Sequence, residues 1–143
     1  MRAAIIGALA GALSFPAVVG SAQDKGNKPR LDLRASPRFA FSPASINLTA
    51  ELIGGTNIES FHCPELEWDW DDGGKSAHEE DCDPLETGTE IQRRFTAAHE
   101  YRKAGTYNVS LTMRRGEKTL AKQTVKITVR PGLGDRASDP GNE

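Results

Sequence analysis

Hydrophobic and polar residues alternate in short runs along most of this chain. In the clearest run, Tyr107, Val109, Leu111 and Met113 share one parity, with polar residues between them. Successive side chains of a strand point to opposite faces, so a period of two predicts a half-buried β-strand. The same period recurs in three further runs: Ile46, Leu48, Ala50 and Leu52; Leu66, Trp68 and Trp70; and Val125, Ile127 and Val129.

Weaker runs and turn signals fill much of the remaining chain. The weaker runs are Leu31 and Leu33, where a short edge strand could begin, Phe39 and Phe41, and a less regular segment over 91–101 anchored by Phe95 and Tyr101. Glycine-containing turns separate the runs at 54–55, 72–74 and 115–117, and 75–88 is expected to be a charged loop. Short strands without a helical period predict an all-β sandwich in a single domain.

Two segments are more informative, because each reads as a strand that meets a tight turn. They are Glu67-Trp68-Asp69-Trp70-Asp71-Asp72-Gly73 and His99-Glu100-Tyr101-Arg102-Lys103-Ala104-Gly105-Thr106-Tyr107-Asn108-Val109-Ser110-Leu111-Thr112-Met113. A strand through the first segment places both indoles on one face and the carboxylates on the other. The two tryptophans are therefore expected in the core, and an aromatic platform for a ligand is the alternative.

Together these segments resemble the signature of the PKD domain, the immunoglobulin-like module named after the polycystic kidney disease protein. The family pattern runs roughly W-D-F-G-D-G and then H-x-Y-x-x-P-G-T-Y-x-V-x-L-T-V, and the resemblance covers about 38–130. Asp71 stands where the first motif has glycine, and Ala104 stands where the second has proline. The resemblance implies an immunoglobulin-like (PKD-type) β-sandwich of about seven strands, with Trp68 at the position of the core indole.

The residues that match the motif form an expected core signature, in which His99 is a hydrogen-bonded structural residue near Tyr101. Gly105 is expected to occupy a turn with φ > 0, where a side chain would be strained. The signature residues are Trp68, Trp70, Asp72, Gly73, His99, Tyr101, Gly105, Tyr107, Val109 and Leu111.

The ends of the chain differ in character from the sandwich. Arg2, an apolar stretch over 3–19 and the small residues Gly20-Ser21-Ala22 predict a signal peptide over 1–22, cleaved near Ala22. Residues 23–37 are expected to form a polar lead-in, 38–130 the sandwich, and 131–143 a disordered tail. No later apolar run reaches the roughly 20 residues of a membrane span. The protein is therefore expected to be secreted or periplasmic.

Cys63 and Cys82 are the two cysteines of the sequence. In an exported chain an even number of cysteines predicts a disulfide. A zinc site with His62 and His78 is the alternative, but the spacings typical of zinc ligands are missing.

Charge is unevenly distributed, although the formal net charge is only −2. Residues 65–86 hold ten carboxylates and one lysine, whereas 93–130 hold ten Lys or Arg and two glutamates. The acidic segment is expected to be a solvated loop, and no cofactor is expected; a calcium site is the alternative. Its candidate ligands are Asp71, Asp72, Glu80, Asp81 and Asp83, with Glu79 beside them.

Four cations recur on the last predicted strand: Lys118, Lys122, Lys126 and Arg130. Lysines on a terminal strand usually protect a sheet edge from aggregation. The alternative is a binding surface for an acidic protein or glycan. With immunoglobulin-like strand order, one sheet face would grade from acidic residues (Glu65, Glu67, Asp69) through polar ones (Asn108, Ser110, Thr112) to these cations.

Catalysis is not expected, because His99 has no nucleophile motif to serve. PKD modules usually accompany larger surface proteins, proteases and chitinases as spacers or binding units. The resemblance thus implies non-enzymatic recognition of an extracellular or envelope protein or polysaccharide, and no nucleic-acid partner is expected. A structural or assembly subunit, which self-associates through its acidic and basic surfaces, is the alternative.

Overall fold

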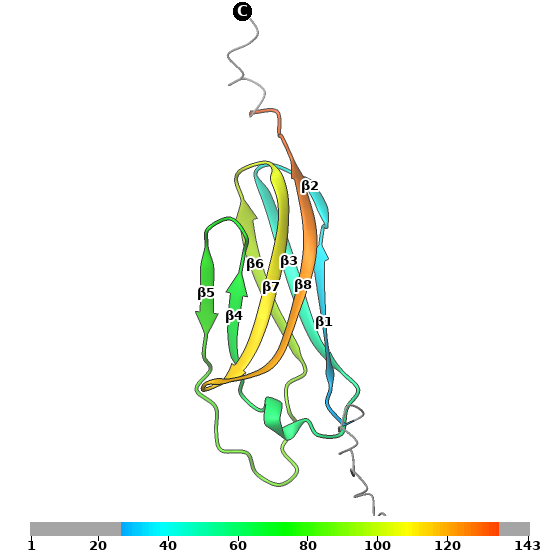
Figure 1. Cartoon of the computed structure of the whole chain (residues 1–143), viewed down its shortest axis with the longest axis vertical. Helices are drawn as coiled ribbons and strands as arrows, with labels where there is room; N and C mark the ends of the chain where they lie inside the picture. The colour runs from blue at the N-terminus through cyan, green and yellow to red at the C-terminus, as the bar shows by residue number, and fades with distance from the viewer. Residues whose placement is uncertain (1–26, 135–143) are drawn as a thin grey trace, which may run out of the picture.

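Two β-sheets pack face to face in the computed structural model, which describes residues 27–134 (Figure 1). The expected signal peptide lies outside the described residues, and so does the predicted tail beyond 134. Among residues 27–134, no helix is long and apolar enough to cross a membrane.

The smaller sheet has the order β1-β3-β6, formed by β1 (Arg30–Ser36), β3 (Ala44–Ile53) and β6 (Arg94–Tyr101). The larger sheet has the order β2-β8-β7-β4-β5. Its strands are β2 (Phe39–Phe41), β4 (Glu65–Asp69), β5 (Lys75–His78), β7 (Gly105–Arg115) and β8 (Lys118–Arg130). All neighbouring strands are antiparallel except β2 and β8, which are parallel. A single 3-10 turn, η1 (Glu59–Phe61), lies between β3 and β4.

The core lies between the sheets and contains the alternating residues that predicted the strands. Trp68 and Trp70 are 4% and 5% exposed, which confirms the core assignment and excludes an aromatic surface platform. Trp68 lies opposite Leu111 on β7, and Val109 lies opposite Val125 on β8. Within the described residues every buried side-chain nitrogen or oxygen has a hydrogen-bond partner. The immunoglobulin-like sandwich predicted from the sequence is confirmed.

The sandwich begins earlier than predicted. Residues 23–37 were expected to form a polar lead-in, but β1 occupies Arg30–Ser36. Leu31, Leu33 and Ala35 are all buried and pair with the alternating apolar residues of β3. The possible edge strand at Leu31 is therefore a full member of the smaller sheet, and the boundary moves from Arg38 to Arg30.

The segment after the β4 turn also differs from the prediction. Residues 75–88 were expected to be a loop, yet Lys75–His78 pair antiparallel with β4 as strand β5. All four side chains of β5 are exposed, so the strand has no hydrophobic period by which the sequence could reveal it. Gly73, with φ of 90°, provides the left-handed conformation in the turn that folds β5 back.

Candidate functional site

A disulfide closes the β4–β5 hairpin at its open end. Cys63 precedes β4 and Cys82 follows β5, with an S–S distance of 2.04 Å and a Cα–Cα distance of 6.1 Å. The predicted disulfide is confirmed, and the zinc alternative is excluded because both thiols are used. The bridge anchors the edge strand β5 and the acidic loop that follows it.

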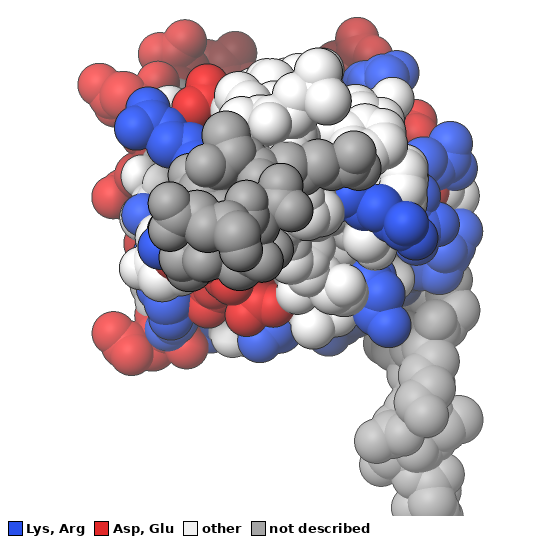
Figure 2. Space-filling view, turned by 90° about the horizontal axis from the view of Figure 1, so that it is seen from above, with Lys and Arg blue, Asp and Glu red and all other residues white. Residues whose placement is uncertain are grey.

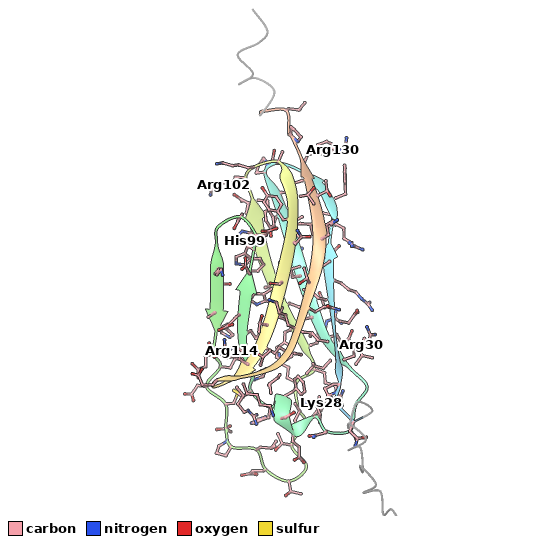
Figure 3. All side chains as sticks on the ribbon, in the orientation of Figure 1. Lys28, Arg30, His99, Arg102, Arg114 and Arg130 are labelled. Carbon is pink, nitrogen blue, oxygen red and sulfur yellow. A yellow bond between two sulfur atoms is a disulfide. The ribbon has the colours of Figure 1, made fainter. Side chains whose placement is uncertain are left out.

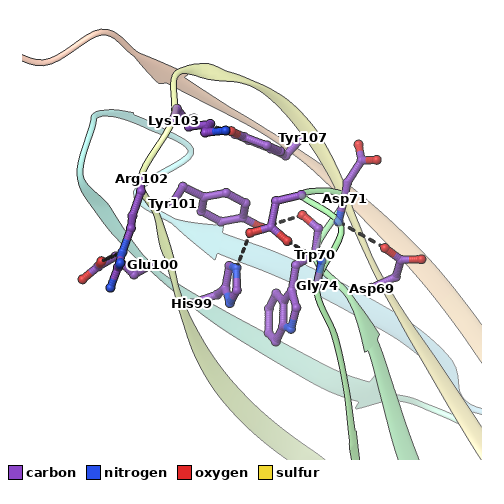
Figure 4. Close-up of polar contacts among 11 residues, drawn as sticks. Asp69, Trp70, Asp71, Gly74, His99, Glu100, Tyr101, Arg102, Lys103 and Tyr107 are labelled. Atoms are coloured by element: carbon purple, nitrogen blue, oxygen red, sulfur yellow. Dashed lines mark hydrogen bonds and ion pairs between the residues drawn. The ribbon is translucent and has the colours of Figure 1, made fainter. Parts of the chain in front are cut away.

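Aromatic rings of the signature stack in a row beneath the turn at the other end of this hairpin (Figure 4). Trp70 lies parallel to Trp68 with ring centroids 5.3 Å apart, and parallel to His99 on its other side at 4.4 Å. His99 in turn meets Tyr101 edge to face at 4.8 Å. The imidazole is thus packed among rings from β6 and from the end of β4.

The carboxylate of Asp72 contacts this row at its exposed side. One of its carboxylate oxygens lies 2.7 Å from His99 Nε2, and the other accepts the Gly74 N–H at 2.9 Å. Partial burial pushes the pKa of Asp72 upward, but the hydrogen bonds from His99 and Gly74 outweigh it and leave the pKa below its usual 3.8. The ionised carboxylate is therefore the form that the turn stabilises.

Two tyrosines complete the cluster by hydrogen bonds to the backbone. The buried Tyr101 hydroxyl donates to the Trp70 carbonyl at 2.9 Å, and burial raises the pKa of Tyr101. The Tyr107 hydroxyl donates to the Lys103 carbonyl at 2.7 Å, and its pKa is also raised, first by burial and then by the charges of Asp72 and Asp71. Both phenols stay protonated. The expected structural role of His99 near Tyr101 agrees with this geometry.

Asp71 stands where the family pattern has glycine and has a positive φ. Its φ is 59°, in the left-handed region that aspartate tolerates better than most residues. Its carboxylate accepts the backbone N–H of Asn108 on β7 at 2.7 Å, while its own N–H donates to Asp69 at 3.1 Å. The aspartate thus links the turn to the neighbouring strand.

Gly105 does not have the positive φ that was expected of it. It is nevertheless confined, because a Cβ built there would lie 3.1 Å from Cζ of Tyr107. The requirement for a small residue at this position comes from the Tyr107 ring and not from backbone conformation.

The outward face of the larger sheet carries the charged residues in register. One row across the strands consists of Lys122, Thr112, Glu67 and Ala77, and the next consists of Thr124, Ser110, Asp69 and Lys75. The predicted order of acidic β4, polar β7 and basic β8 is therefore present on this face. In Figure 3, Arg130 lies at the upper end of β8 and Arg114 near the lower end of β7.

A shallow depression of about 570 Å³ lies on this face. Carboxylates, ammonium groups and hydroxyls surround it: its lining residues are Glu67, Trp68, Asp69, Lys75, Ser76, Ala77, Ser110, Thr112 and Lys122. Lys75 Nζ lies 3.1 Å from Asp69, and Arg114 lies 3.6 Å from Glu67. The hydrogen bond from the Asp71 N–H, followed by that from Lys75, lowers the pKa of Asp69. The depression thus offers charges of both signs and several hydroxyls to a polar ligand.

Two details of this face differ from the sequence prediction. Lys75 belongs to it, because β5 adds a cation beyond the acidic residues of β4. Lys118 does not share the face with Lys122, Lys126 and Arg130, because the register shifts between Met113 and Arg114 and places Lys118 opposite Arg115. Such a bulge is invisible in the periodicity of β8 alone. The Asp72-Gly73 dipeptide, by contrast, was a usable hairpin signal for β5.

The candidate calcium ligands do not come together. Asp71 and Asp72 lie in the turn after β4 and bind backbone amides of the protein. Glu80, Asp81 and Asp83 follow β5, which runs antiparallel to β4 and returns the chain to the opposite end of the hairpin. Within residues 27–134, no three His, Cys, Asp or Glu side chains form a group that could hold a metal ion.

Comparison with solved structures identifies the architecture. The PKD domain of an M14-like peptidase from Thermoplasmatales archaeon SCGC AB-540-F20 superposes on this chain with a TM-score of 0.50 at 15% sequence identity. The match covers 73% of this chain and 98% of that domain. The fold is that of a PKD domain. No protein-family model matches the chain, and no curated protein matches its sequence.

The PKD fold agrees with the signature observed in the sequence. At this level of identity the likeness establishes the architecture alone. Both the fold and the Cys63–Cys82 disulfide are compatible with an extracellular location.

Proposed function

We propose that this chain is an exported, non-catalytic recognition module that binds an extracellular or envelope protein or polysaccharide. The outward face of the larger sheet is its binding surface. The observation that carries this proposal is the depression of about 570 Å³ on that face, with charged residues of both signs and hydroxyls around it. Convergent polar groups in a concave site are typical of ligand-binding surfaces.

The composition of the depression favours a polar ligand. Ser110 and Thr112, whose side chains lie on the outward face, provide hydroxyl groups that donate and accept hydrogen bonds, as sugar hydroxyls require. Lys122 has no ion pair among the described residues, so its ammonium group is available to an anionic group of the ligand. An acidic polysaccharide or an acidic protein segment therefore fits this surface best.

A non-catalytic role is supported by the environment of the signature histidine. The Nε2 atom of His99 is bound to Asp72, and one face of the ring is covered by Trp70. A general base requires a nucleophile within hydrogen-bond reach, and the ring neighbours of His99 are aromatic. The pair therefore fixes the turn and is not positioned to transfer a proton to a substrate.

The test uses the disulfide-bonded protein from residue 23 onward against panels of neutral and acidic polysaccharides and cell-envelope extract. Binding of a retained ligand is then titrated at low and high ionic strength. Exposed charge pairs weaken as the screening length falls from about 10 Å at 0.1 M to about 3 Å at 1 M salt. We expect markedly weaker binding at high salt and after the double substitution Lys122→Glu with Lys126→Glu.

The matched control is Arg94→Glu with Lys118→Glu. This pair makes the same change in net charge, but Arg94 lies on the smaller sheet and Lys118 lies off the binding face. The control should keep the affinity. Binding that is insensitive to salt and to both double substitutions would rule out the charged face. If the face variant keeps its ligand but aggregates more readily, the lysines only protect the sheet.

A structural or assembly subunit is the alternative function. It rests on two surfaces at opposite ends of the sandwich: the β2 edge of the larger sheet and the acidic loop that follows β5.

A further inference from the structure

An exposed aromatic patch surrounded by positive charge lies on the edge strand β2. The aromatic–basic patch consists of Phe39, Phe41 and Arg130, with the exposed Arg38 next to Phe39 in the sequence. Phe39 and Phe41 are 50% and 57% exposed, and their rings meet edge to face with centroids 5.9 Å apart. The Arg130 guanidinium lies 5.2 Å from the centre of the Phe39 ring. Exposed large apolar groups that cluster in this way mark interaction sites.

The cations of the patch are not neutralised within the described part of the chain. The ion pairs between residues 27 and 134 include neither Arg38 nor Arg130. Figure 2 shows this end of the molecule from above, with blue Lys and Arg atoms gathered on the right, where β1 and β2 lie in Figure 1. A partner for this surface must therefore bring both apolar surface and negative charge.

The acidic loop over residues 79–86 has the complementary composition. Its carboxylates are Glu79, Glu80, Asp81, Asp83 and Glu86. Leu85 is 40% exposed among them, and only Glu80 has an ion pair within residues 27–134, at 3.6 Å from His78. The disulfide at Cys82 fixes the loop, and His62 Nε2 lies 2.9 Å from the Asp83 carbonyl oxygen.

The two surfaces lie at opposite ends of the sandwich. In Figure 1, β2 is at the upper end and the loop after β5 is at the lower end. The patch of one molecule therefore cannot contact the acidic loop of the same molecule. A second copy of the chain can bring its loop to the patch.

We propose that this protein self-associates head to tail, with the acidic loop of one copy docked on the aromatic–basic patch of the next. Leu85 packs against Phe39 and Phe41, while the carboxylates around it face Arg38 and Arg130. An interface between two different surfaces is heterologous, so each added copy leaves one free patch and one free loop. The assembly is a chain of copies and not a closed two-fold dimer.

The charges of the patch and of the acidic loop favour this arrangement over a symmetric one. A two-fold contact of patch on patch would set Arg38 and Arg130 against their own copies, and loop on loop would oppose ten carboxylates, five from each molecule. Like charges brought together across an interface oppose binding, whereas patch on loop pairs opposite charges. Neither docking surface includes a residue that lines the depression.

The test is sedimentation velocity of the disulfide-bonded protein from residue 23 onward. At low ionic strength, we expect the weight-average mass to rise with concentration to more than twice the monomer mass, and to fall back toward the monomer at high salt. Two variants remove one surface each: Phe39→Ser with Phe41→Ser removes the patch, and Asp83→Lys with Leu85→Ser removes the loop. Each variant alone should stay monomeric, with an unchanged melting temperature because the altered side chains are exposed or lie in the loop.

Mixing the two variants separates a head-to-tail contact from every symmetric one. The patch variant keeps its loop and the loop variant keeps its patch, so an equimolar mixture should form a one-to-one dimer and nothing larger. A wild-type protein that stays monomeric at low salt would overturn the proposal. It would also be overturned by variants that associate like the wild type, or by a mixture that forms no dimer.

A further substitution distinguishes this contact from the binding face. Lys122→Glu lies in the middle of β8 and outside both docking surfaces. It should leave the concentration dependence of the mass unchanged, whatever its effect on ligand binding. If Lys122→Glu abolishes association, the contact lies on the sheet face and the head-to-tail arrangement is wrong.

Discussion

Asp71 departs from the family pattern at a position where the backbone of this chain has a positive φ. Glycine stands there in the family pattern, and Asp71 has a φ of 59°, in the left-handed region that glycine enters most readily. Aspartate is one of the few residues that visit this region with modest cost. Its hydrogen bond to the Asn108 N–H offsets part of that cost and joins the turn to β7.

The largest loss of stability from a single substitution is expected at the buried indole of Trp68. Trp68→Ala should lower the free energy of unfolding by about 3–5 kcal/mol, because it leaves a cavity between the sheets and removes the stacking partner of Trp70. Urea denaturation at neutral pH measures the change. Thr96→Ala on the exposed side of β6 is the control and should stay within about 0.5 kcal/mol of the wild type. An unchanged melting temperature for Trp68→Ala would contradict the core assignment.

Asp72 links stability to pH through its hydrogen bonds. Its pKa in the folded protein is lowered from 3.8, so its contribution is complete above the unfolded pKa and is lost as the pH falls through the folded value. Asp72→Asn should therefore be less stable than the wild type at neutral pH, and the difference should vanish under strongly acidic conditions. Urea denaturation across this range measures both curves.

The control for the Asp72 experiment is Asp81→Asn, which removes an exposed carboxylate of the acidic loop without touching the cluster. It should be close to the wild type at every pH. Parallel curves for Asp72→Asn and the wild type would show that the His99 contact contributes nothing that depends on charge.

Strand β5 is the least firmly held strand of the larger sheet. None of its four side chains is buried, so the ladder to β4 and the Cys63–Cys82 bridge hold it in place. Lys75, Ser76 and Ala77 of this strand line one side of the depression. The disulfide therefore supports the proposed binding site as well as the fold.

The contribution of the bridge can be measured directly. Cys63→Ser with Cys82→Ser should lower the free energy of unfolding by roughly 2–4 kcal/mol, as expected for a closed loop of about 20 residues. Hydrogen exchange should increase first in β5 and the acidic loop, because no buried side chain holds them. Intact mass after alkylation, with and without reductant, confirms the starting state. Two free thiols in freshly exported protein would contradict the bridge.

The strands that bury alternating residues were predicted from the sequence, and the strand that buries none was not. The β3, β4, β7 and β8 segments were identified because their buried residues alternate, and the graded charges followed from the same parity. β5 buries nothing and was missed. Lys118 was assigned to the wrong face because a bulge reverses parity in β8 without altering its sequence pattern. Phe39 and Phe41 alternate like core residues, but their register opposite Thr128 and Arg130 places both rings on the outward face of the sheet.

The molecule presents two kinds of surface, and each of the two proposals concerns one of them. The depression on the larger sheet suits a polar ligand, whereas the β2 edge of that sheet and the acidic loop at the opposite end suit further copies of the chain. A linear assembly would leave the binding faces free along its length, so that many weak contacts act together on one extended ligand. Salt sensitivity is common to both surfaces, and the variants described above distinguish them.

The directions of β1 and β8 also determine how the sandwich responds to mechanical force. The described chain enters at the lower end of the molecule and leaves at the upper end, so β1 and β8 both run along the line that joins these points (Figure 1). A pull on the two ends slides these strands along their neighbours and strains the rungs of each ladder together. Strands peeled from one end would lose the same hydrogen bonds one at a time, at lower force. Pulling the two described ends apart therefore loads these ladders in shear along the long axis of the sandwich.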